Sequence, residues 1–169
     1  MNENGNVIRR LVRIAVMTAV LEAAKFALNA VPNVELVTLL LIVYTKQFGW
    51  KDSLIVSLLF AAIESMWWGI SIWTVTYFYV WPILVFLTAG IKEEGSVWPY
   101  CLLSAVFGLL FGMLCALVTL VTSGWNAAVA WWIAGIPFDL IHGVSNFVIC
   151  FLLYKPLRNA LRHITENDI

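Results

Sequence analysis

Charged side chains are scarce in this sequence. Asp, Glu, Lys and Arg make up 12% of its 169 residues, whereas hydrophobic residues make up 62%. Soluble domains average about 25% charged and about 45–50% apolar residues. A chain of this length still exposes roughly 30% of its surface after folding, so this much apolar surface cannot be hidden from water. The composition therefore predicts an integral membrane protein, with room for six or seven helical spans and none for a large domain outside the bilayer.

Several functional signatures are also missing. The formal net charge is +0, which excludes a basic surface for nucleic acid. The cysteines Cys101, Cys115 and Cys150 occur singly in apolar stretches, so we predict packing residues and no metal site or disulfide framework. There is no GxxxxGK[ST], HExxH or GxSxG motif. We therefore expect no cofactor and no ATP hydrolysis by the chain itself.

Helix breakers divide the apolar sequence into six runs. Pro32 follows the first run and Gly49 the second. Asp52 is the expected N-cap of the third, Pro99 suits the first turn of the fifth, and Pro156 is expected to stop the last. Runs of this length favour helices over tilted barrel strands. The first run lacks a small-residue cleavage site, which favours a helix over a removed signal peptide. The predicted spans form one domain over residues 1–169 and cover residues 10–29, 33–48, 52–70, 76–91, 99–121 and 127–154.

The basic residues indicate how these helices cross the bilayer. An even number of spans puts both termini on one side. Nine of the ten basic residues fall at the termini or in the second and fourth loops: Arg9, Arg10, Arg13, Lys46, Lys51, Lys92, Lys155, Arg158 and Arg162. The other three loops carry none, so the positive-inside rule makes the basic positions cytoplasmic. We predict an all-α membrane protein of six transmembrane helices with both termini in the cytoplasm.

Tryptophan is concentrated toward the predicted outer side. Seven of the nine tryptophans lie there: Trp67, Trp68, Trp73, Trp81, Trp125, Trp131 and Trp132. These rings either form an ordinary interfacial belt or stack on a planar ligand, because aromatic faces bind conjugated rings and cations. The density of WWGISIWTVTYFYVW exceeds what anchoring needs. We therefore take these as candidate ligand-stacking residues: Trp67, Trp68, Tyr77, Trp131 and Trp132.

Ionisable side chains inside a membrane are costly, so each one is a functional candidate. Glu22, Lys25 and Asn29 share one face of the first helix. Either Glu22 and Lys25 neutralise each other, or Lys25 and Asn29 meet an anionic or carbonyl group of a ligand. Glu64 is a further candidate in the third span. Glu35 either favours the positive end of the second helix or reaches an outer cavity.

The last span carries a polar stripe. Trp132, Asp139 and Asn146 are spaced by seven residues, with His142 between them. Pro137 predicts a kink beside the stripe. Asp139 and His142 form a buried interhelical hydrogen-bond pair, contact a ligand, or act as an acid–base pair. One carboxylate and one imidazole are an incomplete set of metal ligands.

A second face of the first helix favours a protein partner. Ala15, Ala19 and Ala23 form an AxxxAxxxA series, which lets another helix approach closely. This face lies about a quarter turn from the Glu22 and Lys25 face. The first helix is thus expected to serve a ligand and a docking partner at once.

The sequence resembles the substrate-binding S components of energy-coupling factor (ECF) vitamin transporters. The resemblance rests on six helices in a short chain with both ends inside, an aromatic outer loop before the fourth helix, and the segments AVMTAVLEA, VPNVELVTLLL and IPFDLIHGVSNF. It implies capture of a vitamin or related micronutrient outside the bacterial cytoplasmic membrane. It also implies docking through the first-helix alanines onto a membrane scaffold subunit, with ATP hydrolysis by two separate ATPase subunits and no enzyme activity in this chain.

Two other functions remain open from the sequence. One is a small membrane-embedded enzyme that uses Asp139 and His142, and the other is a self-contained secondary transporter. Secondary transporters often contain internal repeats, but residues 1–85 and 86–169 show no convincing similarity. The aromatic and charged residues suit riboflavin, a pyridoxine-like or thiamin-like ring, or cobalamin, without choosing among them.

Overall fold

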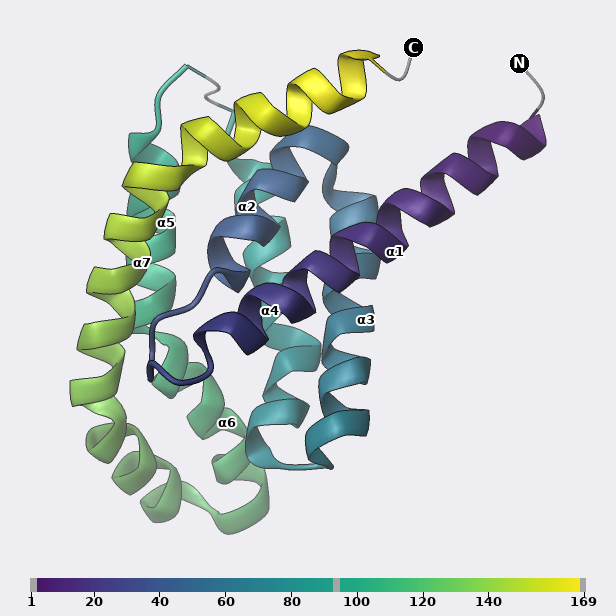
Figure 1. The fold of residues 1–169 in the computed structure, drawn as a ribbon. Helices are drawn as coiled ribbons and strands as arrows, with labels where there is room; N and C mark the ends of the chain where they lie inside the picture. The colour runs from purple at the N-terminus through teal and green to yellow at the C-terminus, as the bar shows by residue number, and fades with distance from the viewer. Residues whose placement is uncertain (1–2, 93–94, 168–169) are drawn as a thin grey trace.

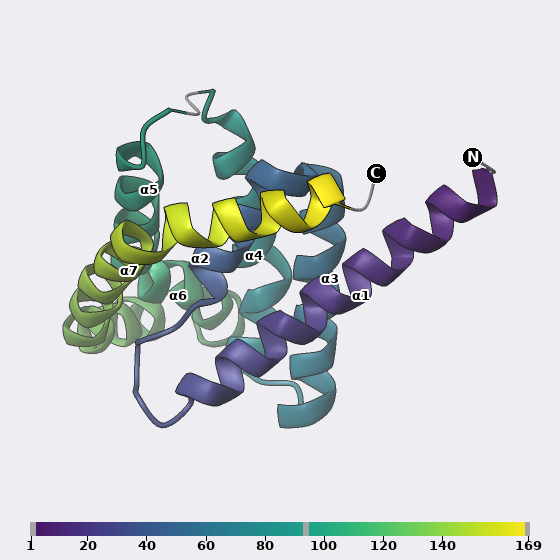
Figure 2. The ribbon, with the colours of Figure 1, turned by 45° about the horizontal axis from the view of Figure 1, so that its top comes forward.

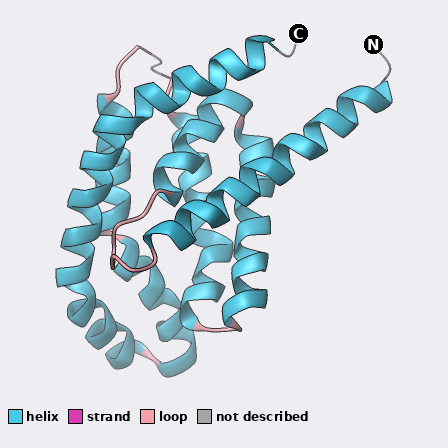
Figure 3. Cartoon of the chain, in the orientation of Figure 1, coloured by secondary structure: helices cyan, strands magenta, loops and turns pink. Residues whose placement is uncertain are grey.

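The computed structural model describes residues 3–92 and 95–167, and its regular elements are all helices (Figures 1 and 3). They are α1 (Glu3–Leu28), α2 (Val37–Phe48), α3 (Trp50–Trp68), α4 (Ile72–Gly90), α5 (Trp98–Leu109), α6 (Phe111–Ser123) and α7 (Trp125–Asn167). Only Leu110 separates α5 from α6, so these two form one interrupted rod. The all-α prediction is confirmed for the described residues, with six rods in the predicted order.

Within the part of the chain that the structure describes, three stretches are long and apolar enough to cross a membrane. They are Ile72–Gly90, Trp98–Ser123 and Trp125–Ile164 within α7. By contrast, α2 is apolar but has only 12 residues. Length and composition therefore support the last three of the six predicted spans directly.

Both ends of the chain lie at the same end of the bundle (Figure 1). The α2–α3 junction and the connection that follows α4 lie there too, whereas the α3–α4 and α6–α7 junctions lie at the opposite end. The predicted cytoplasmic basic positions belong to the first group of segments. The helices therefore place the basic segments together at one end of the bundle, as the positive-inside prediction requires.

The short helix α2 occupies the centre of the bundle. Every residue from Val37 to Thr45 is buried, and α2 contacts α1, α3, α4, α5 and α7. A helix that is apolar all round needs cover on every side, and its neighbours provide it. The first residue of α2, Val37, also lines a cavity. The central helix thus forms one wall of that cavity.

The predicted N-cap role of Asp52 is wrong. Helix α3 begins at Trp50, directly after Gly49, whose φ of 88° lies in the left-handed region that glycine adopts without strain. Asp52 therefore sits inside the first turn, and its carboxylate accepts hydrogen bonds from Arg10 Nε at 2.7 Å and Arg13 Nη2 at 2.6 Å. These contacts join α3 to α1.

Helix α7 does not stop at Pro156, contrary to the prediction. It continues through Pro137 and Pro156 to Asn167. A proline removes one backbone donor and strains the preceding turn, which bends a helix without always ending it. Accordingly, α7 curves around the bundle and its last part turns across the end where the termini lie (Figures 1 and 2).

Two glycines allow α5 and α7 to pack closely. A Cβ atom added at Gly108 would lie 2.8 Å from the backbone nitrogen of Gly143, and one added at Gly143 would lie 2.5 Å from the side chain of Leu109. Small residues of this kind let helices approach within an apolar bundle. The contact also fixes the position of the α7 segment that follows Pro137.

Gly108→Ala should therefore destabilise the protein by about 1–3 kcal/mol, because the added methyl group pushes α5 away from the α7 backbone. Thermal unfolding of the purified protein in detergent measures this effect. Gly135→Ala is the matched control, since nothing lies within 4 Å of a Cβ atom there, and alanine is the better helix former. Equal stability of the two variants would contradict the close contact.

Candidate ligand-binding pocket

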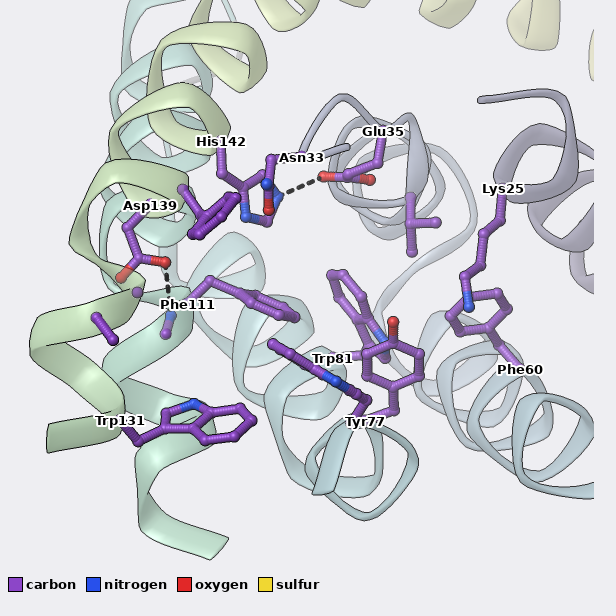
Figure 4. Close-up of a pocket in the computed structure, with 16 residues that line it drawn as sticks. Lys25, Asn33, Glu35, Phe60, Tyr77, Trp81, Phe111, Trp131, Asp139 and His142 are labelled. Atoms are coloured by element: carbon purple, nitrogen blue, oxygen red, sulfur yellow. Dashed lines mark hydrogen bonds and ion pairs between the residues drawn. The ribbon is translucent and has the colours of Figure 1, made fainter. Parts of the chain in front are cut away.

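A cavity of about 480 Å³ lies inside the helical bundle (Figure 4). Its lining residues come from α1, α2, α3, α4, α6, α7 and the α1–α2 loop: Lys25, Asn33, Glu35, Val37, Phe60, Trp73, Tyr77, Trp81, Phe111, Gly112, Trp131, Ala134, Gly135, Phe138, Asp139 and His142. Its volume falls within the range of about 300–1,000 Å³ that is common for small-molecule sites. We call it the aromatic pocket.

Four aromatic rings form a continuous wall of this pocket. Phe60 stacks on Tyr77 with ring centroids 5.8 Å apart, Tyr77 contacts Trp81 at 5.5 Å, and Trp81 contacts Phe111 at 5.7 Å. The wall runs from α3 across α4 to α6. Aromatic faces of this kind bind flat rings and cations.

Lys25 stands over one end of the aromatic wall. Its Nζ lies 5.1 Å from the ring centroid of Tyr77 and forms an ion pair with Glu64 of α3. Glu64 is fully buried behind the pocket and does not line it. Glu22, the other predicted partner, has two buried carboxylate oxygens without a hydrogen bond. Lys25 therefore takes its contact partner from another helix.

Glu35 performs both of the roles that the sequence left open. Because α2 begins at Val37 and not at residue 33, Glu35 lies in the α1–α2 loop. Its Oε2 accepts the backbone N–H of Thr38 at 2.8 Å, which satisfies a free donor of the first turn of α2. Its Oε1 accepts from His142 Nε2 at 3.3 Å, on the pocket side (Figure 4). Burial acts to raise the pKa of Glu35, but these hydrogen bonds outweigh it and hold the pKa below its ordinary value.

Two more hydrogen bonds hold the same segment against α7. Ser145 Oγ donates to the backbone carbonyl of Asn33 at 2.8 Å, and Asn146 Nδ2 donates to Thr38 Oγ1 at 3.3 Å. Asn33 has a φ of 59°, a left-handed conformation that asparagine tolerates better than most residues. We call His142, Ser145 and Asn146 the α7 latch. The latch fixes the loop that supplies two pocket residues.

Asp139 joins α7 to α6. Its Oδ1 accepts the backbone N–H of Gly112 at 2.9 Å, and its Oδ2 is buried without a partner. The interruption at Leu110 places Gly112 in the first turn of α6, where backbone N–H groups have no partner within the helix. A Cβ atom at Gly112 would lie 2.5 Å from Oδ2, so only glycine fits beside the carboxylate.

Asp139 and His142 share the pocket but bond to different elements. Asp139 hydrogen-bonds to α6, whereas His142 hydrogen-bonds to the α1–α2 loop. The His142 and Phe111 rings meet in a T-shaped arrangement with their centroids 5.0 Å apart. Both side chains are buried, and each hydrogen-bonds from α7 to another segment of the chain. Each contributes a polar group to the pocket from the same face of α7.

Six of the predicted binding residues meet in the aromatic pocket: Lys25, Glu35, Tyr77, Trp131, Asp139 and His142. The others lie outside it. Asn29, Trp67, Trp68 and Trp132 are exposed, and Trp67 and Trp68 contact Phe26 of α1.

Sequence reasoning missed several residues that line the pocket. Trp73 and Trp81 belong to the outer tryptophan group, yet nothing in their spacing separates them from their exposed neighbours. Phe60 and Phe111 carry no sequence signal, since a phenylalanine in an apolar helix suits lipid as well as a cavity. Asn33 was predicted only as a helix boundary.

The alanine face of α1 is exposed along its length. Ala15, Ala19 and Ala23 are all exposed, whereas Met17 and Leu21 between them are buried against the bundle. The face predicted for docking is therefore not covered by the described part of the chain.

Metal-binding geometry is not found in residues 3–92 and 95–167, where no three His, Cys, Asp or Glu side chains are grouped closely enough to hold an ion. Cys101, Cys115 and Cys150 are free and buried, as predicted for packing residues. Comparison with protein-family models, curated proteins and solved structures gave no match to the chain. The function is therefore argued from the pocket.

Glu35→Gln should lower stability by about 1–3 kcal/mol near neutral pH, because hydrogen bonds to a charged group are lost. The pKa of Glu35 is lower in the folded protein than its ordinary value of about 4.3. Its stabilising effect is therefore complete above that value and is lost as the pH falls through the folded-state pKa. The thermal stabilities of the two proteins should therefore converge as the pH falls below about 4.3 toward the folded-state pKa of Glu35.

Ser145→Ala is the control for this prediction. It removes an uncharged bond of the same latch, so its effect should not change over that pH interval. A Glu35→Gln difference that stays constant down to pH 3 would show that the carboxylate charge does not stabilise the latch.

Proposed function

We propose that this chain is the substrate-binding subunit of a membrane transporter, which captures a water-soluble vitamin or related micronutrient in the aromatic pocket. The observation that carries this proposal is the pocket itself. Its walls are mainly aromatic, and a few polar side chains converge on it: Lys25, Glu35, Asp139 and His142. A mostly apolar cavity with a few placed polar groups is typical of small-molecule sites.

The surface of the bundle supports a membrane location. Large apolar side chains are exposed along the helices, including Leu102 and Val106 on α5 and Ile141 and Val144 on α7. Exposed apolar surface on this scale suits lipid and not water. Together with the three apolar stretches, it supports a multi-pass membrane protein, and the resemblance to ECF S components implies the bacterial cytoplasmic membrane.

The position of the pocket suits capture from outside the cell. Trp73 and Trp131 lie near the beginnings of α4 and α7, at the end of the bundle opposite the termini (Figure 1). By the positive-inside rule the termini are cytoplasmic, which turns this end outward. The pocket then lies in the outer half of the membrane.

Separate subunits are proposed to drive transport. The sequence has no phosphate-binding loop, and the resemblance to ECF S components implies two ATPase subunits and a membrane scaffold subunit. The exposed alanines on α1 provide a smooth face for the scaffold. An enzyme function has weaker support, because Asp139 and His142 each hydrogen-bond to a different segment of the chain.

Trp131→Ala should weaken ligand binding by about 1–3 kcal/mol, the range for loss of one aromatic stacking partner. The ligand is first identified by mass spectrometry of the protein purified from cells grown in rich medium, and its affinity is then measured by fluorescence quenching. Trp132→Ala is the matched control, since this neighbouring ring lies outside the pocket and is 39% exposed. Equal effects of the two substitutions would remove stacking from the proposal.

Ala19→Trp should abolish cellular uptake and prevent co-purification of the scaffold subunit, because a bulky ring keeps the partner helix away from α1. Ligand affinity of the isolated variant should stay nearly unchanged, since Ala19 does not line the pocket. Leu102→Trp, at an exposed position on α5, controls for a bulky ring in lipid. Uptake in cells that lack the scaffold and ATPases would show that the chain transports alone.

A further inference from the structure

The charged groups around the aromatic pocket do not balance. Four carboxyl groups lie in it or within electrostatic reach of its lining: Glu22, Glu35, Glu64 and Asp139. The opposing groups are one lysine, Lys25, and one histidine, His142. They come from α1, α3, α7 and the α1–α2 loop, while the lining residues of α2, α4 and α6 are uncharged.

The ion pairs within this set leave two carboxyl groups, Glu22 and Asp139, without an ion-pair partner. Lys25 is taken by Glu64, and His142 by Glu35. Both oxygens of Glu22 and Oδ2 of Asp139 are buried with no hydrogen-bond partner in the described structure. A buried carboxylate without a partner is costly, and the cost falls when a cation or a hydrogen-bond donor reaches it. When these carboxyl groups are ionised, the pocket is therefore short of positive charge, whether or not His142 is protonated.

The aromatic wall offers a second attraction for a cation. The faces of Phe60, Tyr77, Trp81 and Phe111 follow one another along the pocket, and a cation over such faces is attracted by the ring quadrupoles. Lys25 already uses this attraction at the Tyr77 end of the wall. The rest of the wall leads toward Asp139 and His142 (Figure 4).

We infer that the pocket selects an organic cation, namely a positively charged heteroaromatic ring. This inference rests on the proposed function and names the class of ligand for the same site. An anionic ligand would face Glu35 and Asp139 and would find only Lys25, which already has a partner. A cationic ring is attracted by these carboxyl groups and stacks on the wall.

The test uses three probes of similar shape and different charge: 1-methylquinolinium, 4-methylquinoline and quinoline-4-carboxylate. Each is bound at pH 8 to the full chain in lipid nanodiscs, with equilibrium dialysis against empty nanodiscs as the blank. The cation should bind about tenfold or more tightly than the neutral probe, and the anion should bind least. Competition with the co-purified ligand places the probe in the pocket.

Charge-removing variants separate attraction from shape. Asp139→Asn should weaken binding of the cation about tenfold and leave the neutral probe unchanged, because the substitution keeps the volume and removes the charge. Glu22→Gln is the second variant, since Asp139 also holds α6. Asp52→Asn is the matched control, because its carboxylate is paired with Arg10 and Arg13 on α1 and does not line the pocket.

The outcomes distinguish this inference from the proposed function. If 4-methylquinoline or quinoline-4-carboxylate binds as tightly as the cation, or if the co-purified ligand is an anion, the inference is overturned and the proposed function stands. If none of the probes binds and no compound co-purifies, both fail.

Discussion

The polar contacts between α7 and the segment that leads into α2 are the constraint on which the pocket depends. His142, Ser145 and Asn146 bond to Glu35, Asn33 and Thr38 in turn. In an apolar bundle a polar group has few other partners, so each of these bonds fixes a position as well as adding stability. Without the latch, neither Glu35 nor the start of the central helix would have a fixed place beside the pocket.

The same stretch of α7 sets the opposite wall. Gly108 and Gly143 bring α5 against α7, and the interruption at Leu110 frees the backbone N–H of Gly112 for Asp139. One turn of α7 thereby orients a carboxylate toward α6 and an imidazole toward the α1–α2 loop. The result resembles an ion or ligand site formed at a broken helix, where irregular backbone lines a cavity. Its excess of carboxylate is what gives the pocket a preference for positive charge.

The residues that could be recognised in advance were those that membrane burial makes expensive. Lys25, Asp139 and His142 were predicted as site residues because an ionisable group in an apolar helix needs a reason, and all three line the pocket, whereas Glu64, predicted in the same way, does not. Their partners could not be predicted. Asp52 was expected to cap α3, but Gly49 starts that helix earlier and turns the carboxylate toward α1.

The sequence by itself determined the all-helical class, the apolar character of the rods and the positions of the costly polar groups, because composition and helical periodicity are local properties. Only the tertiary structure decided which aromatic rings face the pocket. Trp131 lines it and the adjacent Trp132 does not, while Phe60 and Phe111 line it without any signal. The direction of a ring depends on how each helix is rotated and tilted by its neighbours, and an apolar side chain suits lipid and cavity equally well.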